Sequence, residues 1–147
     1  MVFYEGDSNR TPLSPGTAGF NAAFTDFQGQ VRKLVTSGKK VFIVLPTPIS
    51  DDIDPFQAVN RVSGIVNWNA GITRDDFNKD FAPITLILRK IANATGAQLL
   101  DPATELCSTT FCSAFKGKAP IYKDVGHIRP FFVSKYVTVF DDVVLRR

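Results

Sequence analysis

The feature that most constrains the fold is an uninterrupted apolar run at residues 41–45, which lies between a turn and a proline-rich stop. A Gly-Lys-Lys turn at 38–40 precedes the run, and Pro-Thr-Pro at 46–48 ends it. Such a run is typical of a central strand in a parallel sheet that is covered on both faces. In the segment before it, residues 19–37, apolar side chains recur three and four positions apart. This spacing predicts an amphipathic helix packed on the strand, and the pair forms half of an α/β crossover unit.

Further elements continue the alternation of helices and strands. Asp54 followed by Pro55 predicts a helix start, with one apolar face extending to Val66. Thr73 and Asp76 resemble a capping box that opens a second helix, which we expect to run to about residue 94. Pro83 predicts a kink or a break in that helix.

The last third of the chain predicts one more strand and one more helix. Residues 97–101 are short and apolar and follow a helix-ending glycine, so we expect a second buried strand. The cysteine-containing segment 106–112 and a polar turn at 116–118 come next. Residues 130–144 show the apolar spacing of a final amphipathic helix.

Composition places the chain in the class of ordinary globular domains. The chain has 147 residues, of which 44% are hydrophobic and 21% are charged, and this balance favours a single domain. The net charge of +3 is spread along the chain, so nucleic-acid binding is not expected. The longest apolar runs fall far short of the roughly 20 residues that cross a bilayer, and the first residues do not resemble a signal peptide.

One aspartate and one histidine are candidates for catalysis. His127 is the only histidine, and Asp124 precedes it by three residues in an expected loop. In a tight turn this spacing lets a carboxylate accept a hydrogen bond from Nδ1–H, which leaves Nε2 available as a general base. Taken alone, the motif is more often a turn with a surface histidine whose hydrogen bonds are satisfied locally.

The two cysteines, Cys107 and Cys112, lie close together in one expected loop. Their spacing permits a small disulfide, whereas a zinc site would need more ligands than two thiols and one histidine. Without an exported context, free buried thiols are favoured slightly over the disulfide.

The order of these motifs resembles the SGNH domain that is fused to membrane acyltransferase-3 O-acetylases. The resemblance rests on Asp101-Pro102 near a strand end, the two cysteines, and the stretch Tyr-x-Asp-x-x-His at 122–127 before the last helix. The strand at 41–45 with its proline-rich exit is also similar to a late strand of the family. The family often continues with Leu-Ser, where this chain has Ile128 and Arg129.

The resemblance implies roles for particular residues. His127 would be the general base that activates a serine, and Asp124 would orient it. Cys107 and Cys112 would form a disulfide, and this pairing favours an oxidising periplasmic or other extracytoplasmic location within an inner-membrane protein.

The nucleophile is the open question. The family carries its serine in a Gly-Asp-Ser block after the first strand, and Gly6-Asp7-Ser8 has these letters. However, only four residues separate the initial Met1 from this block, and two prolines follow where a helix should begin. We therefore expect the chain to be the C-terminal portion of the domain, residues 1–147, with its serine located upstream, and Ser8 remains the alternative.

These inferences lead to one expected fold and function. The fold class is α/β, a three-layer α/β/α sandwich with a mostly parallel sheet, represented by its later strands and helices. The function is acyl transfer, or hydrolysis, of acetyl groups on a cell-envelope polysaccharide through a serine ester. The expected partners are an acyl donor, the glycan and an upstream membrane acyltransferase domain, and no metal or organic cofactor is implied. Two alternatives are a complete small serine esterase that uses Ser8 and a non-catalytic envelope binding domain.

Overall fold

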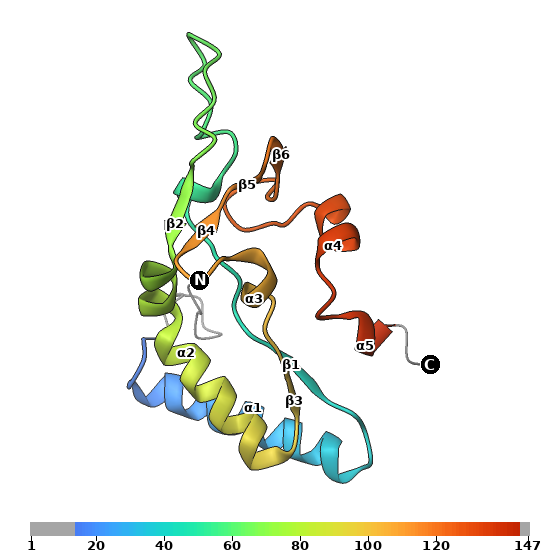
Figure 1. Ribbon diagram of the computed structural model, residues 1–147. Helices are drawn as coiled ribbons and strands as arrows, with labels where there is room; N and C mark the ends of the chain where they lie inside the picture. The colour runs from blue at the N-terminus through green and yellow to red at the C-terminus, as the bar shows by residue number, and fades with distance from the viewer. Residues whose placement is uncertain (1–13, 145–147) are drawn as a thin grey trace. The chain divides into compact units, whose positions relative to one another are not determined.

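The computed structural model describes residues 14–144, except the side chains of residues 142 and 144. These residues divide into two compact units (Figure 1). Unit 1 contains residues 14–43 and 82–99, and unit 2 contains residues 44–81 and 100–144. The elements are, in chain order, α1 (Ala18–Thr36), β1 (Phe42–Val44), the 3₁₀ helix η1 (Asp51–Ile53), β2 (Gly71–Thr73), α2 (Arg74–Thr95), β3 (Gln98–Leu100), α3 (Ala103–Leu106), β4 (Phe111–Ser113), β5 (Phe115–Lys116), β6 (Ala119–Pro120), α4 (Pro130–Tyr136) and α5 (Asp141–Val144).

Unit 1 is built from α1 and the larger part of α2. The hydroxyl of Thr17 caps α1 by accepting a hydrogen bond from the amide of Phe20 at 3.3 Å. The helix ends before Gly38, whose φ of +81° suits glycine. Val31 from α1, Ile91 from α2 and the strand residue Ile43 form a buried apolar cluster. The predicted helix over 19–37 and its packing on the strand are therefore confirmed.

The strands β1 and β3 pair with each other in parallel. The amide of Gln98 donates to the carbonyl of Val41 at 2.9 Å, and the amide of Leu45 donates to the carbonyl of Leu100 at 2.8 Å. Both pairings advance in the same chain direction, as a parallel ladder requires. Both predicted strands are thus confirmed. The expectation that β1 is covered on both faces is wrong at Val44, which is 48% exposed.

Unit 2 holds two antiparallel strand pairs around its own core. β2 pairs with β4, and β5 pairs with β6 across the polar turn at Gly117. The largest buried side chain in the core is Tyr122, which packs with residues from several segments of the unit. The other buried members of this cluster are Ile53, Ala58, Leu106, Ala114, Phe115, Ile121, Phe132 and Val137.

The helix predicted from Asp54 to Val66 is wrong, because this part of the chain forms a hairpin-like arm. The arm, residues 56–69, extends away from η1 and returns to β2 (Figure 1). Val59 and Val66 pair across it as an isolated antiparallel bridge. At the far end, the side-chain oxygen of Asn60 accepts hydrogen bonds from the amides of Val62 and Ser63, both at 3.0 Å. This side-chain capping stabilises a turn in place of a helix.

The predicted last helix is interrupted. α4 ends at Tyr136, and α5 begins only at Asp141. Between them, the Glu105 carboxylate accepts hydrogen bonds from the amides of Thr138 and Val139, at 2.8 and 3.1 Å. These amides are consequently held by a side chain from α3 and do not continue the helix.

α2 begins as the sequence predicted. The Thr73 hydroxyl accepts from the amide of Asp76 at 3.0 Å and donates to the Asp76 carboxylate at 2.6 Å. Pro83 lies inside the helix without ending it. The described fold is therefore α/β, with helices and small two-stranded sheets. Among the described residues, no helix has both the length and the apolar character that a membrane span needs.

Candidate active site

The candidate site lies on a short loop of unit 2, between β6 and α4 (Figure 1). Tyr122 and Ile128 face each other as an antiparallel bridge at its base. Inside the bridge, the amide of Lys123 donates to the carbonyl of His127 at 2.7 Å. Arg129 closes the loop from outside, because its Nε donates to the carbonyl of Tyr122 at 3.1 Å. The loop, residues 121–129, is therefore fixed by its own backbone and by one arginine.

A second segment of unit 2 supports this loop. The amide of Ser50 donates to the carbonyl of Val125 at 3.1 Å. A Cβ atom added to Gly126 would lie 3.5 Å from the side chain of Ile49, so the two segments are in van der Waals contact. The proline-rich exit after β1 thus packs directly against the turn that carries His127.

The Asp124 carboxylate organises the turn. Its Oδ1 accepts hydrogen bonds from the amides of Gly126 and His127, at 3.1 and 3.0 Å. The same oxygen lies 2.7 Å from Nδ1 of His127. The hydrogen bond from the His127 ring is the main cause that lowers the pKa of Asp124, and the Gly126 amide lowers it further.

This arrangement determines the state of the imidazole. An ionised carboxylate can only accept, so Nδ1 of His127 must carry the proton that is shared with Asp124. In the neutral ring, Nε2 then has its lone pair free. The His127 side chain is 82% exposed, and no hydrogen-bond partner for Nε2 is found among residues 14–144. A general base needs this combination of an oriented ring and an accessible nitrogen.

The residue before this loop anchors it to the core. Tyr122 is completely buried, and burial raises the pKa of its phenol well above the usual value. Within the described part of the chain, its hydroxyl has no hydrogen-bond partner. The aromatic ring thus fixes the start of the candidate turn by packing.

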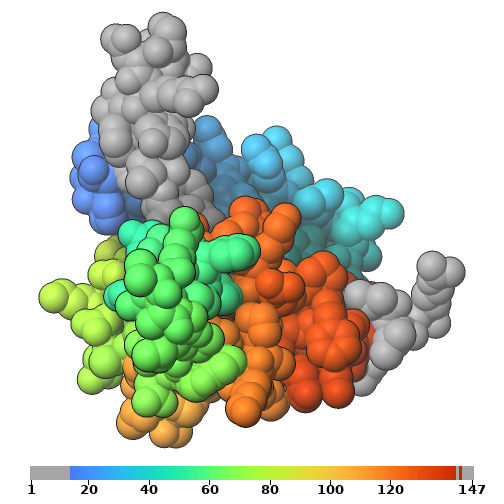
Figure 2. All heavy atoms as spheres, turned by 90° about the horizontal axis from the view of Figure 1, so that it is seen from above, coloured from blue at the N-terminus to red at the C-terminus, as the bar shows by residue number. Residues whose placement is uncertain are grey.

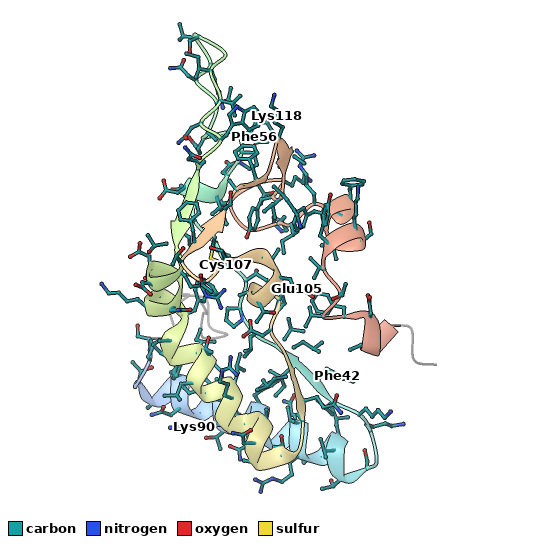
Figure 3. The ribbon with its side chains drawn as sticks, viewed as in Figure 1. Phe42, Phe56, Lys90, Glu105, Cys107 and Lys118 are labelled. Atoms are coloured by element: carbon teal, nitrogen blue, oxygen red, sulfur yellow. A yellow bond between two sulfur atoms is a disulfide. The ribbon has the colours of Figure 1, made fainter. Side chains whose placement is uncertain are left out.

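The predicted disulfide is confirmed. Cys107, at the end of α3, is bonded to Cys112 in β4 (Figure 3). Cys112 is fully buried and packs with Phe77, Phe81 and Ala103. The free-thiol alternative is therefore not what the structure contains.

The alternative nucleophile of the sequence analysis, Ser8, lies outside the described residues. Within residues 14–144, no three His, Cys, Asp or Glu side chains gather closely enough to hold a metal ion.

A comparison with known families decides the identity of the chain. A family model, the SGNH domain fused to AT3 domains, matches residues 3–142. The chain belongs to this SGNH family. The match covers nearly the whole sequence, so it includes both the Asp124–His127 turn and the disulfide. No curated protein and no solved structure matches the chain.

The sequence predicts the contact between Asp124 and His127 but does not reveal the residues that support their turn. In the sequence, Arg129 is only a departure from the family pattern, yet its side chain closes the loop. The sequence gives no role to Ser50, although its amide supports Val125. A signal was available for each residue. Ser50 lies in the segment that follows a buried strand, and Arg129 comes shortly after His127.

Proposed function

We propose that this SGNH domain supplies the base and its orienting acid to a serine acyltransferase or esterase that acts on a cell-envelope polysaccharide. The family as a whole combines the domain with AT3 domains, which supports an esterase- or acyltransferase-like activity. The observation that carries the proposal is the 2.7 Å contact between Nδ1 of His127 and the carboxylate of Asp124.

The residues act in sequence. Asp124 holds Nδ1–H, so Nε2 of His127 removes the proton of a serine as the serine attacks the acyl carbonyl. The protonated ring then gives its proton to the leaving oxygen, and an acyl-serine remains. In the second half, the acceptor hydroxyl of the glycan, or water, gives its proton to His127 and attacks the acyl-serine, and the ring returns the proton to the serine. Transfer to the glycan releases the new ester, and hydrolysis releases the acid.

The serine is proposed to lie upstream of Met1, in a polypeptide that also carries a membrane acyltransferase domain. The chain would then be the C-terminal portion of a three-layer α/β/α sandwich, outside the cytoplasm, and the disulfide supports an oxidising location. Acetyl is the proposed acyl group.

Labelling with a serine-directed fluorophosphonate tests the proposal. In the full-length parent, the label should attach to a serine upstream of Met1, and His127→Ala should slow labelling strongly, because the serine loses its base. Label on Ser8 would show that the chain is a complete small esterase. A parent that takes no label at any serine would support the non-catalytic alternative and contradict the proposal.

A further inference from the structure

A polar hollow at the base of the arm is a candidate binding site that the Asp124–His127 turn does not include. It has a volume of about 170 Å³ and is lined by Asp52, Gln57, Ala58, Asn67, Asn69, Ala70 and Gly71. All of these residues belong to unit 2. Figure 2 shows the arm, in green, on the surface that faces the viewer, beside the orange residues near 115–120.

The polar groups of the hollow are available to a ligand. No hydrogen bond is found for the side chains of Asp52, Gln57 or Asn69 among the described residues. Asn67 uses its side-chain oxygen to accept from the amide of Asn69 at 3.1 Å, which leaves its NH₂ group to donate. Carboxamides both donate and accept, as does each hydroxyl of a sugar.

The only tryptophan of the chain is a sequence neighbour of two lining residues, although its own side chain is not part of the lining of either hollow. Trp68 lies between the lining residues Asn67 and Asn69 and is 43% exposed. Its ring packs edge-on against Phe115, with centroids 5.2 Å apart. The indole is therefore held in place and still presents a flat apolar surface, to which the C–H face of a sugar ring can bind.

A second hollow extends the first along the arm. It has a volume of about 640 Å³ and shares Gln57, Ala58 and Asn67 with the first. It adds Val59, Asn60, Ser63, Ile65 and Val66. A surface of mixed polar and apolar side chains that continues along a segment suits an extended chain better than a single compact molecule. Asp52 is the only charged residue that lines either hollow, so neither lining offers a cation to an acidic ligand.

We propose that the arm and its two hollows form a binding site for a neutral oligosaccharide, which would be the acceptor glycan. This identification of the ligand as the acceptor rests on the proposed function. The segment that contributes Asp52 to the hollow is connected to the candidate turn, because Asp52 lies two residues after Ser50, whose amide donates to the carbonyl of Val125, two residues before His127.

The single tryptophan provides a direct test. Trp68 fluorescence of the chain is titrated with neutral tetrasaccharides of glucose, galactose, rhamnose and N-acetylglucosamine, and with a glucuronic acid oligomer. At least one neutral oligosaccharide should give a saturable change at millimolar or lower concentration, and the acidic oligomer should bind more weakly. Gln57→Ala with Asn69→Ala should weaken binding tenfold or more, whereas Val62→Ala at the tip of the arm should leave it unchanged.

Two results would overturn the site: no saturable change with any neutral oligosaccharide, or equal affinity in the folded double variant. If circular dichroism shows that the double variant is unfolded, the two single substitutions replace it under the same criterion. His127→Ala separates this inference from the proposed function. The substitution should leave the titration intact, so a failure of catalysis and a failure of glycan binding are read independently.

Discussion

At the scale of single residues, the proposed function depends on the contact between Asp124 and His127. The Oδ1 atom of Asp124 holds Nδ1–H at 2.7 Å and also receives two backbone amides. Asp124→Asn keeps the shape of the side chain but removes the charge that fixes the tautomer. We expect acyl transfer by the full-length parent to fall by up to about 10⁴-fold, on the precedent of serine proteases.

The matched control for that substitution is Asp80→Asn, an exposed aspartate on α2 that has no role in the site. It should keep the parental rate in the same assay. Equal rates for Asp124→Asn and Asp80→Asn would show that the carboxylate at 124 does not orient the base.

The pKa of Asp124 gives a second prediction at this scale. The hydrogen bond from His127 is the largest cause that lowers it below the usual 3.8. Because the folded pKa is lowered, the stabilising effect of the ionised carboxylate is present above pH 3.8 and is lost as the pH falls through the folded pKa.

Carbon-13 chemical shifts of the Asp124 carboxyl group, followed against pH, check this prediction. The group should titrate below 3.8 in the parental chain and move back toward 3.8 in His127→Ala, which removes the largest cause. A titration at or above 3.8 in the parental chain would contradict the hydrogen-bonding pattern.

At the scale of elements, the disulfide joins the end of α3 to β4. Closing so short a loop restricts the unfolded chain, and the chain-entropy model gives about 2 kcal/mol for a loop of this size. Cys107→Ser with Cys112→Ser should lower the free energy of unfolding by about that amount or somewhat more, because Cys112 is fully buried among apolar side chains.

Urea unfolding monitored by circular dichroism measures this difference. Reduction of the parental chain should have a similar effect and should leave the double variant unchanged. If the double variant were as stable as the oxidised parental chain, the bond would have no part in holding α3 on β4.

The elements also show where local sequence patterns are enough to predict secondary structure. The helix over 19–37 and the strands at 41–45 and 97–101 were predictable because each has one strong local signal, helical periodicity or an apolar run between turns. The helix predicted from Asp54 failed because Val59 and Val62 fit helical spacing, yet Val62 is fully exposed in the arm. The turn residues Asn60 and Gly64 were the competing signal.

Some features depend on contacts that local sequence does not reveal. Glu105 interrupts the last helix from 33 residues away, by accepting from the amide of Thr138. The Asp124–His127 contact was predictable because both residues lie in one turn. The support of that turn by Ser50 was not, since it joins segments that are 75 residues apart.

At the scale of the whole molecule, the chain alone should be a poor esterase. If the serine is upstream of Met1, the purified 147-residue chain has a base with no nucleophile to activate. We expect turnover of p-nitrophenyl acetate close to the buffer rate. Rapid turnover that disappears in Ser8→Ala would instead identify Ser8 as the nucleophile and the chain as complete.

The most direct test of the central claim is the initial rate of acetyl transfer by the full-length parent with and without the imidazole of His127. The account predicts that His127→Ala removes most of the activity while circular dichroism stays unchanged, because the side chain is exposed and its loss leaves no cavity. Lys123→Ala, an exposed neighbour on the same turn, serves as the control and should transfer normally. Near-normal transfer by His127→Ala would contradict the assignment of this residue as the general base.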